Sequence, residues 1–125
     1  MTSKTFLTVH GAVYIFFALA LFLAPQLLWP QYGLQVNDRY AVFLSQHNSI
    51  FLGGIGVISF LFRTAEPGSD AARTILTGLL WTNVLGAAVT LYACVAGLFT
   101  GFGWSDPAFF ALLAGLCAAQ LRKNG

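Results

Sequence analysis

The sequence predicts an all-α fold, an integral membrane four-helix bundle that forms a single domain over residues 1–125. Four long stretches contain no Asp, Glu, Lys or Arg, and together they occupy most of the chain. Hydrophobic residues make up 58% and charged residues 8%, whereas a soluble domain has about 25% charged residues. A bilayer core needs about 20 apolar residues per helical span, and backbone polar groups inside lipid must be bonded within the protein. The stretches are bounded by Lys4 and Asp38, Arg39 and Arg63, Arg73 and Asp106, and Asp106 and Arg122.

The first two spans are predicted at about residues 5–29 and 40–62. Pro25 is expected to kink the end of the first span, because proline removes a helix hydrogen bond, and the residues after it should lie at the membrane interface. Asn37 or Asp38 is expected to cap the second span, since short polar side chains accept hydrogen bonds from the free N–H groups of a first turn.

The third and fourth spans are predicted at about residues 71–99 and 107–121. Ser69 or Asp70 is the expected cap of the third span, and a glycine-rich stretch is expected to end it. Asp106 is the expected cap of the fourth span, because the proline that follows is well suited to the first helical position.

The basic residues predict the orientation of the bundle. If the four spans alternate in direction, one side of the membrane carries all but one of the Lys and Arg residues. Cytoplasmic loops are enriched in these residues, so both termini are expected in the cytoplasm. The five residues on that side are Lys4, Arg63, Arg73, Arg122 and Lys123, and Arg39 lies on the other side.

Small residues suggest how the spans pack. Helices in lipid associate through close backbone approach and interhelical hydrogen bonds, so small residues are favoured at their contacts. We expect the second, third and fourth spans to pack on one another, and the bulkier first span to lie at the edge or to face a partner. The glycines predicted at helix contacts are Gly53, Gly56, Gly78, Gly86 and Gly115.

Two polar residues fall at the same predicted depth in different spans. Counting about 1.5 Å per helical residue places Tyr14 of the first span level with Asn83 of the third. A hydrogen bond between them would join the two helices.

A run of polar residues in the outer half of the second span is the most unusual feature. The run contains Gln46, His47 and Asn48, and Thr90 and Tyr92 of the third span lie at a similar depth. Polar side chains within a span are costly in lipid, so they mark functional positions. We expect a water-filled vestibule, a ligand site or a subunit contact here, unless the second span begins later than predicted.

The two histidines raise the question of a pigment. His10 and His47 lie too far apart in depth to hold one iron between them, by helix rise. Hydrogen bonding to a neighbouring hydroxyl or carbonyl is the expectation for each. Ligation of a separate pigment by either one is the alternative. No cofactor or metal is therefore expected, with a tetrapyrrole or quinone as the alternative.

Several function classes are disfavoured by what the sequence lacks. It contains no Ser–His–Asp candidate, no metal-ligand cluster, no phosphate loop and no dinucleotide fingerprint, so no enzymatic activity is expected. No carboxylate falls inside a predicted span, which argues against a proton-coupled drug exporter. No basic run with interleaved aromatic residues suggests nucleic-acid binding.

The layout resembles small bacterial four-span membrane proteins of the DoxX-like type. The features that carry the resemblance are Ala24-Pro25-Gln26-Leu27-Leu28-Trp29, then Tyr32-Gly33-Leu34, then Leu52-Gly53-Gly54-Ile55-Gly56 in a span that ends at Arg63, and Arg73 after a short loop. The resemblance implies a bundle in a bacterial cytoplasmic membrane, and it implies no role for any residue.

The first functional expectation is a non-catalytic membrane protein that acts by assembly. It would be an accessory subunit of a larger membrane complex or a homo-oligomer, with lipids and membrane subunits as its partners. The alternative is a protein that binds a lipid, quinone or tetrapyrrole at the polar part of the second span. A small transporter ranks third, because few polar residues continue through the middle of the spans.

Overall fold

The computed structural model describes residues 1–124 and is helical, with no strand in that range. Four of its helices, α1, α3, α4 and the segment containing α5, are long and apolar enough to cross a membrane. The predicted all-α fold with four long helices is therefore confirmed. The elements are α1 (Ser3–Leu23), α2 (Pro25–Leu28), η1 (Trp29–Tyr32), α3 (Arg39–Leu61), η2 (Phe62–Thr64), α4 (Asp70–Val95), η3 (Gly101–Trp104) and α5 (Ser105–Asn124).

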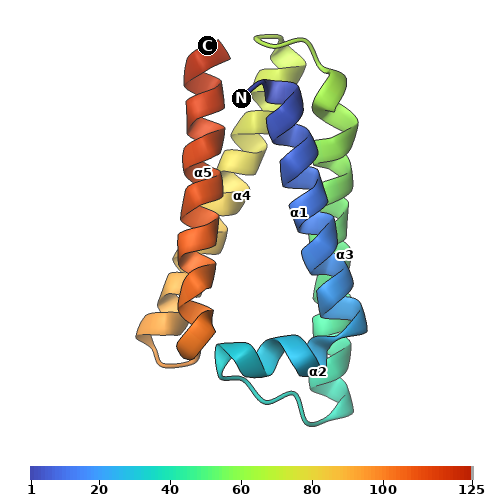
Figure 1. Ribbon diagram of the computed structural model, residues 1–125, viewed down its shortest axis with the longest axis vertical. Helices are drawn as coiled ribbons and strands as arrows, with labels where there is room; N and C mark the ends of the chain where they lie inside the picture. Colours follow the sequence, from blue (N-terminus) through green and yellow to red (C-terminus); the bar gives the residue numbers. More distant parts are fainter. Residues whose placement is uncertain (125) are drawn as a thin grey trace.

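The long helices form two pairs, α1 with α3 and α4 with α5 (Figure 1). The pairs come together at the end that carries both termini, here called the terminal end. At the opposite end, called the α2 end, α2 and η1 cross from one pair toward the other (Figure 1). The predicted packing of the third span on the fourth is confirmed by the α4–α5 pair. The predicted packing of the second span on these two is wrong, because α3 pairs with α1 instead.

Polar side chains fix the starts of three helices. Thr2, Asp38 and Ser69 each accept a hydrogen bond from the backbone N–H three residues later. Asp38 and Ser69 were the expected caps. The cap predicted for the fourth span is wrong, since α5 begins at Ser105 and Asp106 lies in its first turn.

Two span ends also differ from the prediction. The first helix ends at Leu23 rather than continuing to residue 29, because Pro25 begins the separate helix α2. Helix α4 ends at Val95 rather than at residue 99. Gly97 stops it by adopting a φ of 80°, a left-handed conformation that glycine reaches without a steric cost.

Helices α1 and α3 cross where two glycines meet. A Cβ atom at Gly11 would lie 2.7 Å from the carbonyl oxygen of Gly56, and a Cβ at Gly56 would lie 2.8 Å from that of Gly11. Gly53 contacts Ala18 in the same pair. Helix α1 is also the most deeply buried of the four, so its predicted place at the edge is wrong. Its Phe16 and Phe22 face outward, while its Gly11 faces α3.

The other predicted packing glycines divide into two groups. Gly86 lies against the ring of Phe110, which joins α4 to α5. Gly78 and Gly115 have open space where a Cβ would stand, so their prediction as contacts within the bundle is wrong. For Gly78 the reason is the rotation of α4 about its axis, which turns Leu76, Leu79 and Asn83 inward instead. The apolar core at the terminal end comprises Phe6, Leu7, Leu76, Leu79 and Cys117.

Candidate functional site

A cavity of about 470 Å³ separates the two helix pairs in the half of the bundle nearer the α2 end. Its volume falls within the roughly 300–1,000 Å³ of small-molecule sites, which are largely apolar with a few polar groups. Aromatic and aliphatic side chains form most of the walls: Phe17, Leu21, Leu28, Phe51, Leu52, Leu85, Val89, Phe99, Phe109 and Phe110. The lining residues with polar atoms in their side chains are Tyr14, Trp29, Tyr32, Asn48, Thr90 and Asp106.

The α2–η1 segment closes the cavity at the α2 end. Trp29 Nε1 donates a hydrogen bond to Ser45 Oγ of α3 at 2.9 Å. Tyr32 Oη donates to Asp106 Oδ1 of α5 at 2.8 Å, and the Thr100 N–H donates to the Tyr32 carbonyl at 2.8 Å. The segment therefore ties the α1–α3 pair to the α4–α5 pair across the floor of the cavity.

Tyr32 is the central residue of this floor. Its side chain is only 4% exposed, and its ring meets that of Phe99 edge to face. Burial, followed by the neighbouring Asp106 carboxylate, raises the pKa of the Tyr32 hydroxyl. The hydroxyl therefore keeps its proton at neutral pH and remains the donor to Asp106.

The cavity is closed on one side and open on the other. Phe17 of α1 and Phe109 of α5 meet edge to face, with ring centroids 5.4 Å apart, and this contact closes the α1–α5 side. On the α3–α4 side the lining residues Asn48, Phe51 and Val89 are all exposed. The opening therefore lies between α3 and α4, on the flank of the bundle rather than at either end.

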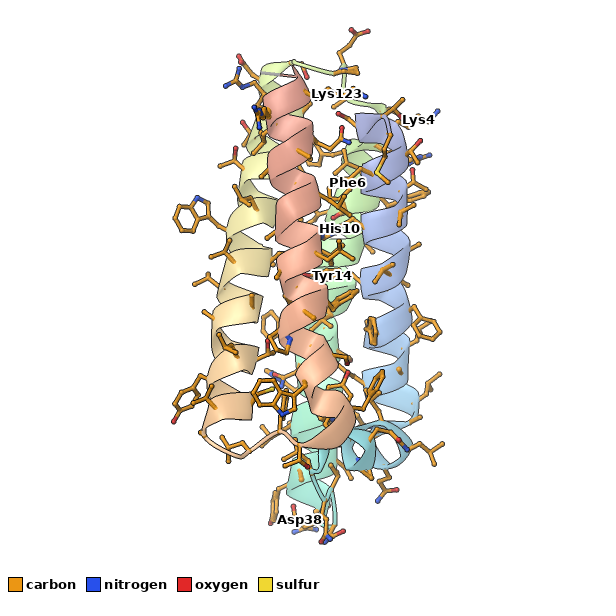
Figure 2. The ribbon with its side chains drawn as sticks, turned by 60° about the vertical axis from the view of Figure 1, so that its left-hand side comes forward. Lys4, Phe6, His10, Tyr14, Asp38 and Lys123 are labelled. Atoms are coloured by element: carbon orange, nitrogen blue, oxygen red, sulfur yellow. The ribbon has the colours of Figure 1, made fainter. Side chains whose placement is uncertain are left out.

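A buried network of polar side chains lies just beyond the cavity, toward the terminal end. Tyr14 Oη, at the cavity wall, donates to Asn83 Oδ1 at 2.6 Å, the interhelical bond expected from their depths. Asn83 Nδ2 lies 3.0 Å from His10 Nε2, and His10 Nδ1 lies 3.2 Å from Ser59 Oγ. Three helices, α1, α3 and α4, are joined in this way. Figure 2 shows the positions of His10 and Tyr14 along α1.

The contacts of Asn83 fix the tautomer of His10. Asn83 Nδ2 also donates to the Leu79 carbonyl at 2.8 Å, so the amide cannot be rotated to place its oxygen there. The nitrogen then faces His10 Nε2, which must accept, and Nδ1 must carry the proton and donate to Ser59. Ser59 Oγ in turn donates a hydrogen bond to the Ile55 carbonyl at 2.9 Å. Both nitrogens of His10 are thus engaged in hydrogen bonds, and the partner of Nδ1 is a hydroxyl, as expected from the sequence.

The structure brings together only some of the predicted site residues. Asn48 and Thr90 both line the cavity. Gln46 instead donates to the Phe22 carbonyl of α1, and His47 is exposed on the flank beside the rings of Phe43 and Phe51.

Tyr92 is 67% exposed and does not line the cavity. Of these five residues, the cavity therefore brings together only Asn48 and Thr90. Successive residues of a helix point in different directions, so a contiguous polar run cannot face one site. Within residues 1–124, no three His, Cys, Asp or Glu residues lie close enough to hold a metal ion.

Sequence reasoning missed the floor of the cavity. Asp106 was expected to be a helix cap outside the span, and Trp29 and Tyr32 were expected only at the interface. One signal was present, because Asp106 is the single charged residue between Arg73 and Arg122. Comparisons with protein-family models, with curated proteins and with solved structures gave no match to this chain.

Proposed function

We propose that this chain is a non-catalytic integral membrane protein that binds one small hydrophobic ligand between its helix pairs. The observation that supports the proposal is the cavity of about 470 Å³, with its apolar walls and few polar groups. The proposed location is the bacterial cytoplasmic membrane, with both termini in the cytoplasm. A DoxX-like relationship remains a prediction from the sequence pattern.

The position of the opening supports a ligand that comes from the bilayer. If α3 and α4 span the membrane, the gap between them faces lipid tails rather than water. A ligand dissolved in the membrane would enter sideways without crossing either surface. The core at the terminal end and the α2–η1 floor separate the cavity from both ends.

Filling the cavity provides the test. Leu52 lines the cavity, so Leu52→Trp should occupy space that a ligand needs. Leu61→Trp makes the same change on the same helix at an exposed position outside the cavity, and serves as the control. Native mass spectrometry of each protein from mild detergent should show a bound small molecule in wild type and in Leu61→Trp, and little in Leu52→Trp. Equal occupancy in all three would count against the proposal.

Assembly is a second candidate function, and one observation favours it. His47 makes no hydrogen bond among the described residues, yet it lies exposed on the flank of α3. An imidazole facing lipid would lack a polar partner, whereas a neighbouring subunit would supply one. We propose that this flank contacts another membrane subunit or a second copy of the chain.

The oligomeric state tests this second candidate. His47→Leu should weaken the assembly, because it removes the polar group while keeping an apolar surface. Leu44→Ile, a change at another exposed position of α3, serves as the control. Light scattering in mild detergent should then show a smaller particle for His47→Leu alone. A wild-type protein that is monomeric and carries no other protein would argue against assembly.

A further inference from the structure

The polar groups of the cavity are mainly acceptors that are free to bind a ligand. Several donors are already used within the protein, since Trp29 Nε1 bonds to Ser45, Tyr32 Oη to Asp106, and Tyr14 Oη to Asn83. Thr90 Oγ1 donates to the Gly86 carbonyl at 2.7 Å, which leaves only its lone pairs for a ligand. Among the described side chains that line the cavity, only the Asn48 amide offers a free donor.

The cavity also contains a carboxyl group that no described basic side chain accompanies. Asp106 is the acidic residue of the lining, and no Lys, Arg or His among the described residues lines the cavity with it. Asp106 Oδ1 accepts from Tyr32, and its other carboxylate oxygen has no hydrogen-bond partner in the described part of the chain. A carboxylate in largely apolar surroundings is costly unless a cation or several donors accompany it.

We propose that the ligand is an amphiphile with a protonated amine head, which binds to the free oxygen of Asp106. This inference rests on the proposed ligand-binding function and specifies the class of ligand. An ammonium head has three donors and no acceptor, which matches the acceptors of the lining, whereas a phosphate or carboxylate head would meet repulsion from Asp106.

The geometry also orients the ligand. Asp106 and Tyr32 lie at the floor of the cavity, at the α2 end. The apolar part then extends away from the floor between Phe51 and Leu85, which lie at the lateral opening. The head therefore lies near the membrane interface and the tail near the bilayer interior, as in the surrounding lipid.

Fluorescence of Trp29, which lines the cavity, provides the measurement. The other two tryptophans, Trp81 and Trp104, are exposed, so both are replaced by Phe. The full chain in phosphatidylcholine nanodiscs is titrated at neutral pH with a long-chain primary amine that carries a nitroxide quencher on its chain. The alcohol and the carboxylate with the same labelled chain are the matched probes.

The amine should quench Trp29 with saturation, and the alcohol and carboxylate should show only the linear quenching of probe dissolved in lipid. Asp106→Asn should weaken amine binding at least about tenfold, the loss expected for a hydrogen bond to a charged group. Asp70→Asn is the control, because Asp70 is also a first-turn carboxylate but lies outside the cavity. Tyr32→Phe removes the bond across the floor and keeps the carboxylate, so it should retain amine binding.

The other outcomes separate this inference from the proposed function. Saturation by the alcohol or carboxylate as tight as that by the amine, or an Asp106→Asn protein that binds the amine like wild type, would overturn the amine assignment and leave a hydrophobic-ligand site. Loss of amine binding in Tyr32→Phe equal to that in Asp106→Asn would assign the effect to the floor rather than to the charge. Absence of saturation with every probe, together with an empty wild-type protein in native mass spectrometry, would overturn both.

Discussion

The polar network around Asn83 shows how single residues join the helices. The Asn83 side chain is fully buried and contacts Tyr14, His10 and the Leu79 carbonyl, so each of its polar atoms is satisfied. In hydrocarbon surroundings no water is available to hydrogen-bond an unpaired polar group, so leaving it unpaired costs free energy. The network therefore requires α1, α3 and α4 to hold one relative arrangement.

The first prediction concerns the protonation of His10. Because Asn83 donates to Nε2, the neutral imidazole should carry its proton on Nδ1. Nitrogen-15 NMR of histidine-labelled protein in lipid should show His10 in this tautomer alone, and His47→Gln protein, which has one histidine, gives the assignment. A proton on Nε2 of His10 would contradict the network.

The second prediction concerns the loss of Asn83. Asn83→Ala should lower the free energy of unfolding by about 1–3 kcal/mol, because interhelical hydrogen bonds are lost and a small void remains. Thr82→Ala is the control, since the Thr82 hydroxyl bonds only to the Gly78 carbonyl of its own helix. Unfolding in mixed detergent, followed by circular dichroism, measures both. Equal stabilities for the two variants would show that the network contributes nothing.

At the scale of elements, the α1–α3 crossing depends on backbone contact. Gly11 and Gly56 allow the two helices to approach until the Cα of each glycine lies close to the backbone carbonyl oxygen of the other glycine. Close approach of this kind is the main source of helix association in lipid, where apolar side chains gain little by leaving the bilayer. The outward-facing phenylalanines of α1 do not determine its partner.

The third prediction tests this crossing. Gly56→Ala should destabilise the protein by about 1–3 kcal/mol, because its new Cβ would overlap backbone that cannot move without separating the helices. Gly54→Ala, two residues earlier, meets open space and should change the stability little. Thermal unfolding of the two variants in the same detergent makes the comparison. A Gly56→Ala protein as stable as Gly54→Ala would disprove the close contact.

At the scale of the whole molecule, four long helices bring both termini to one end (Figure 1). The two helix pairs meet at the terminal core and at the α2–η1 floor, and the cavity lies between these two junctions. Figure 2 shows Lys4 and Lys123 at the terminal end and Asp38 at the opposite end.

The fourth prediction concerns membrane topology. Single cysteines at Glu66 and Lys123 should react with an impermeant maleimide from one side of the membrane, and a cysteine at Asn37 from the other. All three positions are exposed, and the natural Cys94 and Cys117 are buried, so they should give little background. Sealed vesicles of known orientation distinguish the sides. Labelling of residues 66 and 123 from opposite sides would exclude four alternating spans.

Some parts of this fold could be predicted because they depend on nearby residues. The positions of the four long helices follow from the absence of charge, and the caps at Asp38 and Ser69 follow from the side chain three residues before an N–H group. The Tyr14–Asn83 bond followed from depth alone, since two polar groups at one level in lipid have few other partners.

The cavity residues were harder to predict. Asn48 and Thr90 came from the polar pattern, while Asp106 and Tyr32 did not, because their meeting requires a floor segment that returns across the bundle. The same pattern also included His47 and Tyr92, which lie outside the cavity because their directions depend on how α3 and α4 are rotated.

The sequence by itself determined that the chain forms four long apolar helices and where two of them begin. Charge-free length and capping are properties of consecutive residues, so no distant contact is needed to infer them. Only the tertiary structure decided which helices pair, which glycines touch and which polar groups face the cavity. The physical reason is that these helices are apolar on nearly every side, so no polar face in the sequence predicts how each helix is rotated about its axis. Close backbone contacts between helices determine that rotation instead.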